Sequence, residues 1–201
     1  MKKSLLLMAL LSVTVAAHAQ LLVNPQLGVV FTDLTNDQPG VETKAAVDLQ
    51  LGADVRIGGR FYFQPGAHFG RSATTVKYAY TDTTVIEDNL IRTTLKAKAL
   101  VGLNLIKTPI FKLRVNAGPT YEALLSVDNK DDEIQFNKDD YNAGSFNMDA
   151  GVGLDFAMLS AETGVSYGLS KAYRDAGELT QDAKYFTFYF TIGLLLGHSG
   201  T

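Results

Sequence analysis

The sequence predicts an all-β protein, an eight-stranded antiparallel up-and-down transmembrane β-barrel with a polar, plugged interior. Three observations predict this fold class. Apolar and polar residues alternate with period two in eight segments. The connections between these segments are alternately short and long. The polar faces combine charged residues with glycines, which suits a crowded interior better than a surface in water.

Before these segments, the first 19 residues have the pattern of a secretory signal. Two lysines precede an apolar run from Leu5 to Ala17, and small residues surround a cleavage site after Ala19. The run is too short to span about 30 Å of hydrocarbon as a helix, which argues against a membrane anchor. We therefore expect a cleaved signal at residues 1–19 and one outer-membrane β-barrel domain at residues 20–201.

The composition excludes several classes of protein. Loss of the two signal lysines changes the net charge from -3 to -5, so no nucleic-acid partner is expected. The chain has no Cys, which excludes disulfides, thiol catalysis and thiolate metal sites. No later apolar run is long enough for a transmembrane helix, so a membrane would have to be crossed by strands.

The first half of the chain contains four alternating segments, at residues 22–32, 45–57, 60–70 and 91–105. In the second, "VDLQLGADVRI", Leu49, Leu51 and Val55 share one face, and Asp48, Asp54 and Arg56 share the other. The fourth could also be drawn as an amphipathic helix, but period two fits more of its positions.

The second half contains the other four segments, at residues 111–125, 146–158, 161–170 and 185–197. The last of these is aromatic, with Phe186, Phe188 and Phe190 alternating with polar residues. No segment remains that would form a helix to cover the sheet. Helices are therefore not expected to cover the apolar face of this sheet.

The connections fall into two groups. Those around 58–59, 108–109 and 159–160 are short, whereas polar connections near 33–43, 72–89, 127–145 and 171–184 are long. Short periplasmic turns and long external loops produce this rhythm in outer-membrane barrels.

Charged residues and glycines together indicate which face points inward. The lumen of an eight-stranded barrel is just wide enough for side chains, so glycines there make room for large charged residues. We predict a structural interior ion-pair network of Asp48, Asp54, Arg56, Arg60, Arg92, Lys96, Lys98, Lys112, Arg114, Glu122, Asp149, Asp155 and Glu162. The predicted lipid-facing residues are Leu49, Leu51, Val55, Val101, Leu103, Val115, Val152, Leu154, Phe188 and Phe190.

Two prolines lie inside predicted strands on the apolar face. Pro65 and Pro119 each remove a donor from the ladder of backbone hydrogen bonds. Lipid offers no replacement for a missing partner. We therefore predict β-bulges beside Gly66 and Gly118.

Several motifs resemble the outer-membrane β-barrel family typical of Bacteroidota, often called PorT-like. They are "FYFQPGAHFG", "VNAGPTYEALL", "MDAGVGLDF" followed by "AETGVSYGLS", and the closing "TIGLLLG". The fourth strand departs from the family pattern, because it reads "TTLKAKALVG" where relatives have an "xxPLL"-like core. The resemblance implies an eight-stranded outer-membrane barrel. Most such relatives have no assigned biochemical role, and a few look tied to protein secretion.

Little catalytic chemistry is visible in the sequence. His68 is the one histidine between the signal and the C-terminal tail, and we expect it to be a structural interior residue. We predict no catalytic residues, no cofactor and no metal centre. The most acidic stretch, residues 127–142, could hold Ca²⁺ or bridge through divalent ions to anionic glycolipid, but a solvated external loop is the default. Its carboxylates are Asp128, Asp131, Asp132, Glu133, Asp139 and Asp140.

The expected function is a structural or interaction role in the bacterial outer membrane. The extracellular loops would meet a protein partner that the sequence does not identify, the outer surface would meet lipids, and no open pore or enzymatic activity is expected. Three alternatives remain open. They are a soluble periplasmic lipocalin-like barrel that binds an apolar ligand, an outer-membrane lipid hydrolase that uses a Ser with His68, and a narrow channel.

Overall fold

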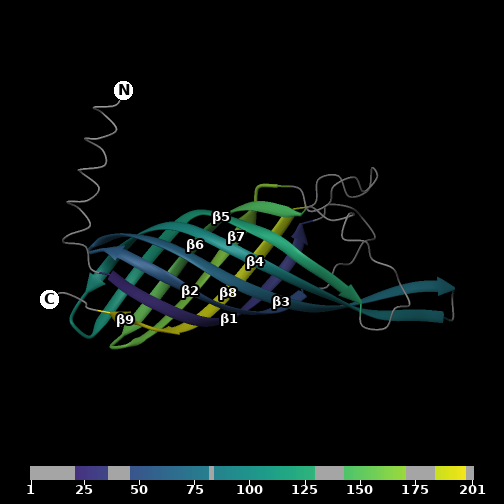
Figure 1. Cartoon of the computed structure of the whole chain (residues 1–201), viewed down its shortest axis with the longest axis horizontal. Coiled ribbons are helices and arrows are strands. Elements are labelled where there is room, and N and C mark those ends of the chain that lie inside the picture. Colours follow the sequence, from purple (N-terminus) through teal and green to yellow (C-terminus); the bar gives the residue numbers. More distant parts are fainter. Residues whose placement is uncertain (1–20, 36–45, 82–83, 130–142, 171–183, 198–201) are drawn as a thin grey trace, which may run out of the picture.

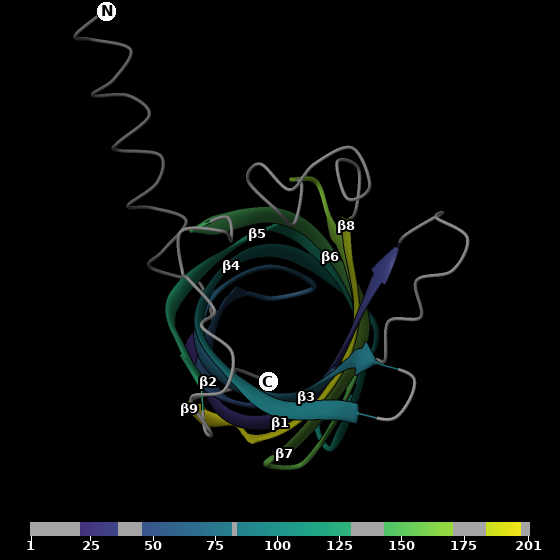
Figure 2. The same cartoon turned by 90° about the vertical axis from the view of Figure 1, so that its right-hand side faces the viewer.

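The computed structural model describes residues 21–35, 46–81, 84–129, 143–170 and 184–197, which form one closed sheet (Figures 1 and 2). Among these residues no helix is long and apolar enough to cross a membrane. The strands are β1 (Leu21–Thr35), β2 (Ala46–Gly58), β3 (Phe61–Thr81), β4 (Thr84–Lys107), β5 (Phe111–Asn129), β6 (Gly144–Phe156), β7 (Leu159–Gly168), β8 (Lys184–Leu194) and β9 (Leu196–Gly197).

The barrel closes through β1. Each strand from β1 to β7 pairs antiparallel with the next one in the chain, and β8 pairs antiparallel with β1. The short β9 continues along β1 in the register of β8, so the two together act as the last strand. Figure 2 looks along the resulting cylinder. The prediction of an eight-stranded antiparallel up-and-down barrel is confirmed.

Apolar side chains line the outside of this cylinder. Leu49, Val101 and Phe188 are 69%, 64% and 45% exposed, although a soluble barrel with an apolar interior would bury all three. The lipocalin-like alternative is therefore wrong. The other predicted lipid-facing residues also lie on this outward face, where Leu51, Val152, Leu154 and Phe190 are exposed and Val55, Leu103 and Val115 are partly exposed.

Two predicted connections are wrong. Residues 72–81 and 84–90, predicted as a long loop, continue β3 and β4 as a paired ribbon beyond the barrel (Figure 1). Their threonines, valines and tyrosines favour strand although the stretch is polar. The last short turn lies at Ala157 and Met158, where Ala157 has a φ of 52°, two positions before the predicted turn. The segments 36–45, 130–142 and 171–183 lie outside the described residues.

The bulges predicted beside Gly66 and Gly118 are absent, because the ladders there are interrupted without a change of register. The β2–β3 ladder omits the position of Pro65, and the β4–β5 ladder omits that of Pro119. A proline lacks its N–H toward one neighbouring strand only, so the ladder loses that bond while the other neighbour holds the register.

Glycines on the inward face leave room for large side chains. A Cβ atom at Gly151 or Gly164 would meet the phenol of Tyr189, and one at Gly153 would meet the guanidinium of Arg114. The alternation of glycine with charged residues is therefore a packing arrangement between neighbouring strands.

Replacing such a glycine tests this packing. We expect Gly164→Val to lower the free energy of unfolding by about 1–3 kcal/mol, because the new side chain collides with Tyr189. Ala150→Val adds a larger side chain on the exposed outer face of the neighbouring β6, so it is the matched control and should have little effect. Urea unfolding in lipid vesicles measures both variants, and equal midpoints would contradict a filled interior.

Candidate functional site: the buried polar interior

One carboxylate, that of Asp54, organises the centre of the interior. The amides of Gln26 and Gln64 donate to its Oδ2 at 2.6 Å each, and Lys98 Nζ donates to the same oxygen at 3.0 Å. His68 Nε2 lies 2.7 Å from Oδ1. These groups come from β1, β3 and β4 and are all buried, so they replace the water that a carboxylate loses inside the barrel.

A second cluster lies nearer the short turns. Arg56 donates from Nη1 to Asp155 Oδ2 at 2.8 Å and from Nη2 to Ser160 Oγ at 2.9 Å. Arg114 bonds the other oxygen of Asp155 at 3.3 Å, bonds Ser160 Oγ at 3.1 Å, and forms an ion pair with Glu162. Ser160 in turn donates to Asp155 at 2.8 Å. Both guanidiniums therefore share one carboxylate and one hydroxyl.

A third cluster lies toward the long connections. Lys96 Nζ is 2.8 Å from Asp149 Oδ2, and Thr120 donates to Oδ1 of the same carboxylate at 3.0 Å. The Lys96 ammonium also lies 5.8 Å from the centre of the Tyr189 ring, whose hydroxyl donates to Glu162 at 3.5 Å. Tyr189 therefore links this cluster to the second one.

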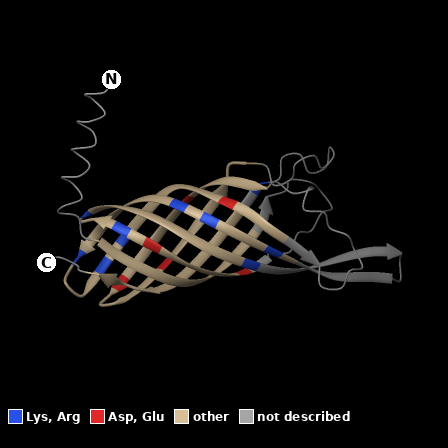
Figure 3. Ribbon diagram, in the orientation of Figure 1, with Lys and Arg blue, Asp and Glu red and all other residues tan. Residues whose placement is uncertain are grey.

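The three clusters contain eight of the thirteen predicted network residues. Their four cations are matched by four carboxylates, and Figure 3 shows both signs distributed along the barrel. Of the others, Asp48, Arg92 and Glu122 are half-buried toward the long connections, and Lys112 is half-buried opposite Asp155 in the β5–β6 ladder.

The prediction that Arg60 points into the interior is wrong. β2 ends at Gly58, which has a φ of 133°, and Arg60 lies exposed in the turn before β3. The alternation that would have placed its side chain inside stops at the turn. Only its carbonyl is engaged with the barrel, where it accepts a bond from the backbone N–H of Asn104 at 2.8 Å.

Sequence reasoning did not identify the uncharged partners of the network. Gln26, Gln64, Thr120 and Ser160 all carry hydrogen bonds to the buried carboxylates. Their positions on the inward face were a usable signal, because a buried carboxylate needs more donors than its one cation supplies. Leu100 was also missed, since it is an apolar residue that lies fully buried on the inward face.

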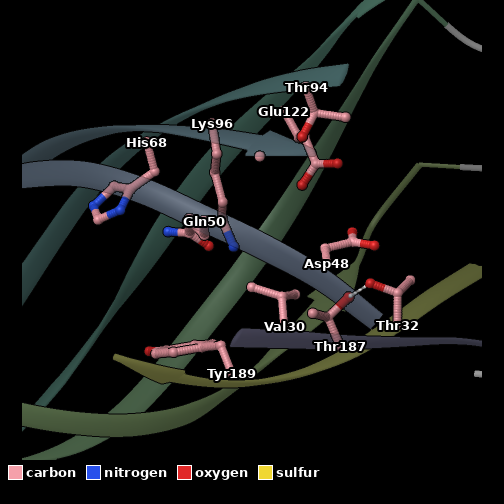
Figure 4. A pocket seen from close by; sticks show the side chains of 11 residues that line it. Val30, Thr32, Asp48, Gln50, His68, Thr94, Lys96, Glu122, Thr187 and Tyr189 are labelled. Carbon is pink, nitrogen blue, oxygen red and sulfur yellow. Dashed lines mark hydrogen bonds between the residues drawn. The ribbon is translucent and has the colours of Figure 1, made fainter. Parts of the chain in front are cut away.

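A small cavity lies inside the barrel, beside the first and third clusters (Figure 4). It has a volume of about 30 Å³, enough for one or two water molecules, and Lys96, His68 and Tyr189 line it together with Asp48 and Glu122. Among the described residues no group of three His, Asp or Glu side chains could hold a metal ion.

Most of the predicted acidic stretch, residues 127–142, lies outside the described residues. The backbone of Asp128 pairs with Ile91 in the β4–β5 ladder. Asp131, Asp132, Glu133, Asp139 and Asp140 lie outside the described residues.

Removing the charge of Asp54 tests how much the interior ion-pair network contributes to the stability of the barrel. Asp54→Asn leaves Lys98 buried without its carboxylate, so we expect a loss of about 3–5 kcal/mol in the free energy of unfolding. The double variant Asp54→Asn with Lys98→Met removes both charges and should recover part of that loss. Arg71→Gln, on the exposed outer face, is the control. Unfolding midpoints in urea measure all three, and a neutral Asp54→Asn would contradict this account.

Similar folds occur among solved structures at low sequence identity. Ail, the attachment invasion locus protein of Yersinia pestis, is 11% identical with a TM-score of 0.49, covering 88% of this chain and 99% of that one. Neisserial surface protein A is 10% identical with a TM-score of 0.47, covering 87% and 96%. LpxR from Salmonella typhimurium is 9% identical with a TM-score of 0.35, covering 85% and 99%. With such low scores, these likenesses assign no function.

Comparison by sequence identifies the family. A search of curated protein sequences finds no matching relative. The family model for the outer membrane protein beta-barrel domain matches residues 16–174, which is most of the chain. This match agrees with the closed eight-stranded barrel and its apolar outer surface. The chain therefore belongs to the outer membrane protein β-barrel domain family and is a protein of the bacterial outer membrane.

Proposed function

We propose that this protein has a structural or interaction role, exercised through its extracellular loops, and that its barrel is not an open pore. One observation carries the closed barrel: buried ion pairs join strands that are not neighbours across the lumen. The motifs quoted from its third, fifth, sixth and seventh strands support a place in the PorT-like branch found in Bacteroidota.

The ion pairs cross the lumen and so block the path of solutes. Asp54 on β2 meets Lys98 on β4, and Arg56 on β2 meets Asp155 on β6. Strands that are not neighbours are thereby joined through the interior. An eight-stranded barrel encloses little more space than its own side chains fill, and these bridges support our proposal that no continuous aqueous path crosses it.

Planar bilayers test the closed interior. We expect the purified protein to give no conductance steps, because water and ions find no route past the clusters. The variant Arg56→Ala with Arg114→Ala removes both guanidiniums of the second cluster and should conduct if it remains folded. Arg71→Gln, on the outer face, is the control and should stay silent. Conductance steps from the unaltered protein would favour the narrow-channel alternative.

Because we propose that the interior is closed, the extracellular loops are the surface that we expect to contact partners. We propose that the long connections face the outside of the cell, while the short turns face the periplasm. The outward apolar residues would contact lipid, and residues 127–142 would form a solvated external loop whose carboxylates are candidates to bind divalent cations that bridge to surface glycolipid. The protein partner is chemically undefined.

Protease treatment of whole cells tests this orientation. We expect cleavage within residues 127–142, whereas the short turn at 108–110 should be cut only after the outer membrane is permeabilised. Mass spectrometry of the fragments locates the sites. Cleavage at the short turn in intact cells, with residues 127–142 protected, would reverse the orientation.

A hydrolase is the second candidate, because His68 and Asp54 lie together as a base and its orienting acid would. Within the described residues, however, His68 Nδ1 has no hydrogen-bond partner, and Nε2 bonds the carboxylate. No serine hydroxyl is bonded to this histidine in the part of the chain that the structure describes. We therefore propose a structural role for His68 and no enzymatic activity.

A further inference from the structure

The two ends of the barrel carry opposite charge. In the sequence, the four polar stretches predicted as long connections, at 33–43, 72–89, 127–145 and 171–184, contain fifteen acidic and six basic residues, and the second of them continues β3 and β4 beyond the barrel. The three short connections, at 58–60, 107–110 and 157–159, contain two basic residues and no acidic ones. The short-turn end is therefore the basic end of an acidic protein.

Structure adds to this basic character. Arg60 and Lys107 are exposed at the turn end, and Lys112 lies directly opposite Lys107 in the β4–β5 ladder. Figure 3 shows several Lys and Arg residues at the end that carries the short turns.

Exposed apolar residues lie beside these cations. Phe61 follows Arg60 and is 76% exposed, and Ile110 is 61% exposed in the turn that follows Lys107. Met158 is 60% exposed at the tip of the third turn. Turns that stood wholly in water would rarely combine such residues, whereas the boundary between acyl chains and headgroups favours basic and apolar side chains together.

The turns also hold one another in place. Ala157 N–H donates to the carbonyl of Ile110 at 2.7 Å, and Leu195 N–H donates to that of Met158 at 2.7 Å. The first bond joins two neighbouring connections, and the second joins the third connection to the last strand. The apolar tips Ile110 and Met158 therefore lie in turns whose backbones are hydrogen-bonded to the neighbouring part of the barrel.

We propose that the short-turn end is a binding surface for anionic phospholipids of the periplasmic leaflet. Arg60 and Lys107 contact headgroup phosphates, and Phe61 and Ile110 anchor the rim in the adjoining acyl chains. A lipid is favoured over an acidic protein because the apolar tips continue the outward apolar band of the strands. This inference rests on the membrane placement proposed above.

Tryptophan fluorescence tests it, since the chain has no Trp. Phe61→Trp reports the turn end and Phe146→Trp reports the opposite end, and both positions are exposed. The protein is reconstituted into vesicles of phosphatidylcholine and phosphatidylglycerol in equal amounts, with brominated acyl chains on one of the two lipids at a time. We expect brominated phosphatidylglycerol to quench Phe61→Trp at least about twofold more than brominated phosphatidylcholine, given the attraction of basic residues to anionic lipid. Phe146→Trp should show no preference.

Charge-removal variants then test whether Arg60 and Lys107, and not other residues of the short-turn end, cause the preference for anionic lipid. Arg60→Gln with Lys107→Gln, in the Phe61→Trp background, should abolish the preference, and raised salt should weaken it. Arg71→Gln with Lys184→Gln removes two charges from elsewhere on the barrel and should leave it unchanged. Equal quenching by the two lipids at Phe61→Trp, or a preference that survives loss of Arg60 and Lys107, would overturn the inference. Absence of quenching by either lipid at both reporters would instead overturn the membrane placement itself.

Discussion

The narrow lumen of an eight-stranded barrel is the constraint on which the rest of this structure depends. Polar side chains that point inward cannot keep their water, so they must bond one another. Asp54 shows the result most clearly, because it is fully buried and four side chains from three strands surround it. The interior is therefore a scaffold that joins opposite walls of the barrel.

The same residues meet both the packing requirement and the charge requirement of this interior. Large groups such as the Arg114 guanidinium and the Tyr189 phenol lie over glycines of adjacent strands. The charges then come in matched sets, so that no cluster leaves a cation without a carboxylate. Both features occupy volume inside the barrel, and they are the basis for the closed interior that we propose.

Because ion pairs and hydrogen bonds occupy the interior, the role that we propose for this protein involves its surfaces. The outer wall is apolar, the long connections are acidic, and the short turns combine cations with exposed apolar tips. Each of these surfaces matches a different environment, namely acyl chains, the cell exterior and the periplasmic headgroup layer. The asymmetry between the two ends supports the orientation that we propose for the barrel in the membrane.

The sequence by itself determined the fold class and the two faces, because period two assigns every strand residue to one side and closure follows when no helix covers the sheet. It could not determine which cation meets which carboxylate. That choice depends on the stagger of strands far apart in the chain, such as β2 against β6. The same holds at the ends of strands, where Arg60 left the predicted face at a turn. At Pro65 the neighbouring strands held the register, so no bulge formed. In each case tertiary geometry decided, because a local pattern fixes the direction of a side chain but not what lies opposite to it.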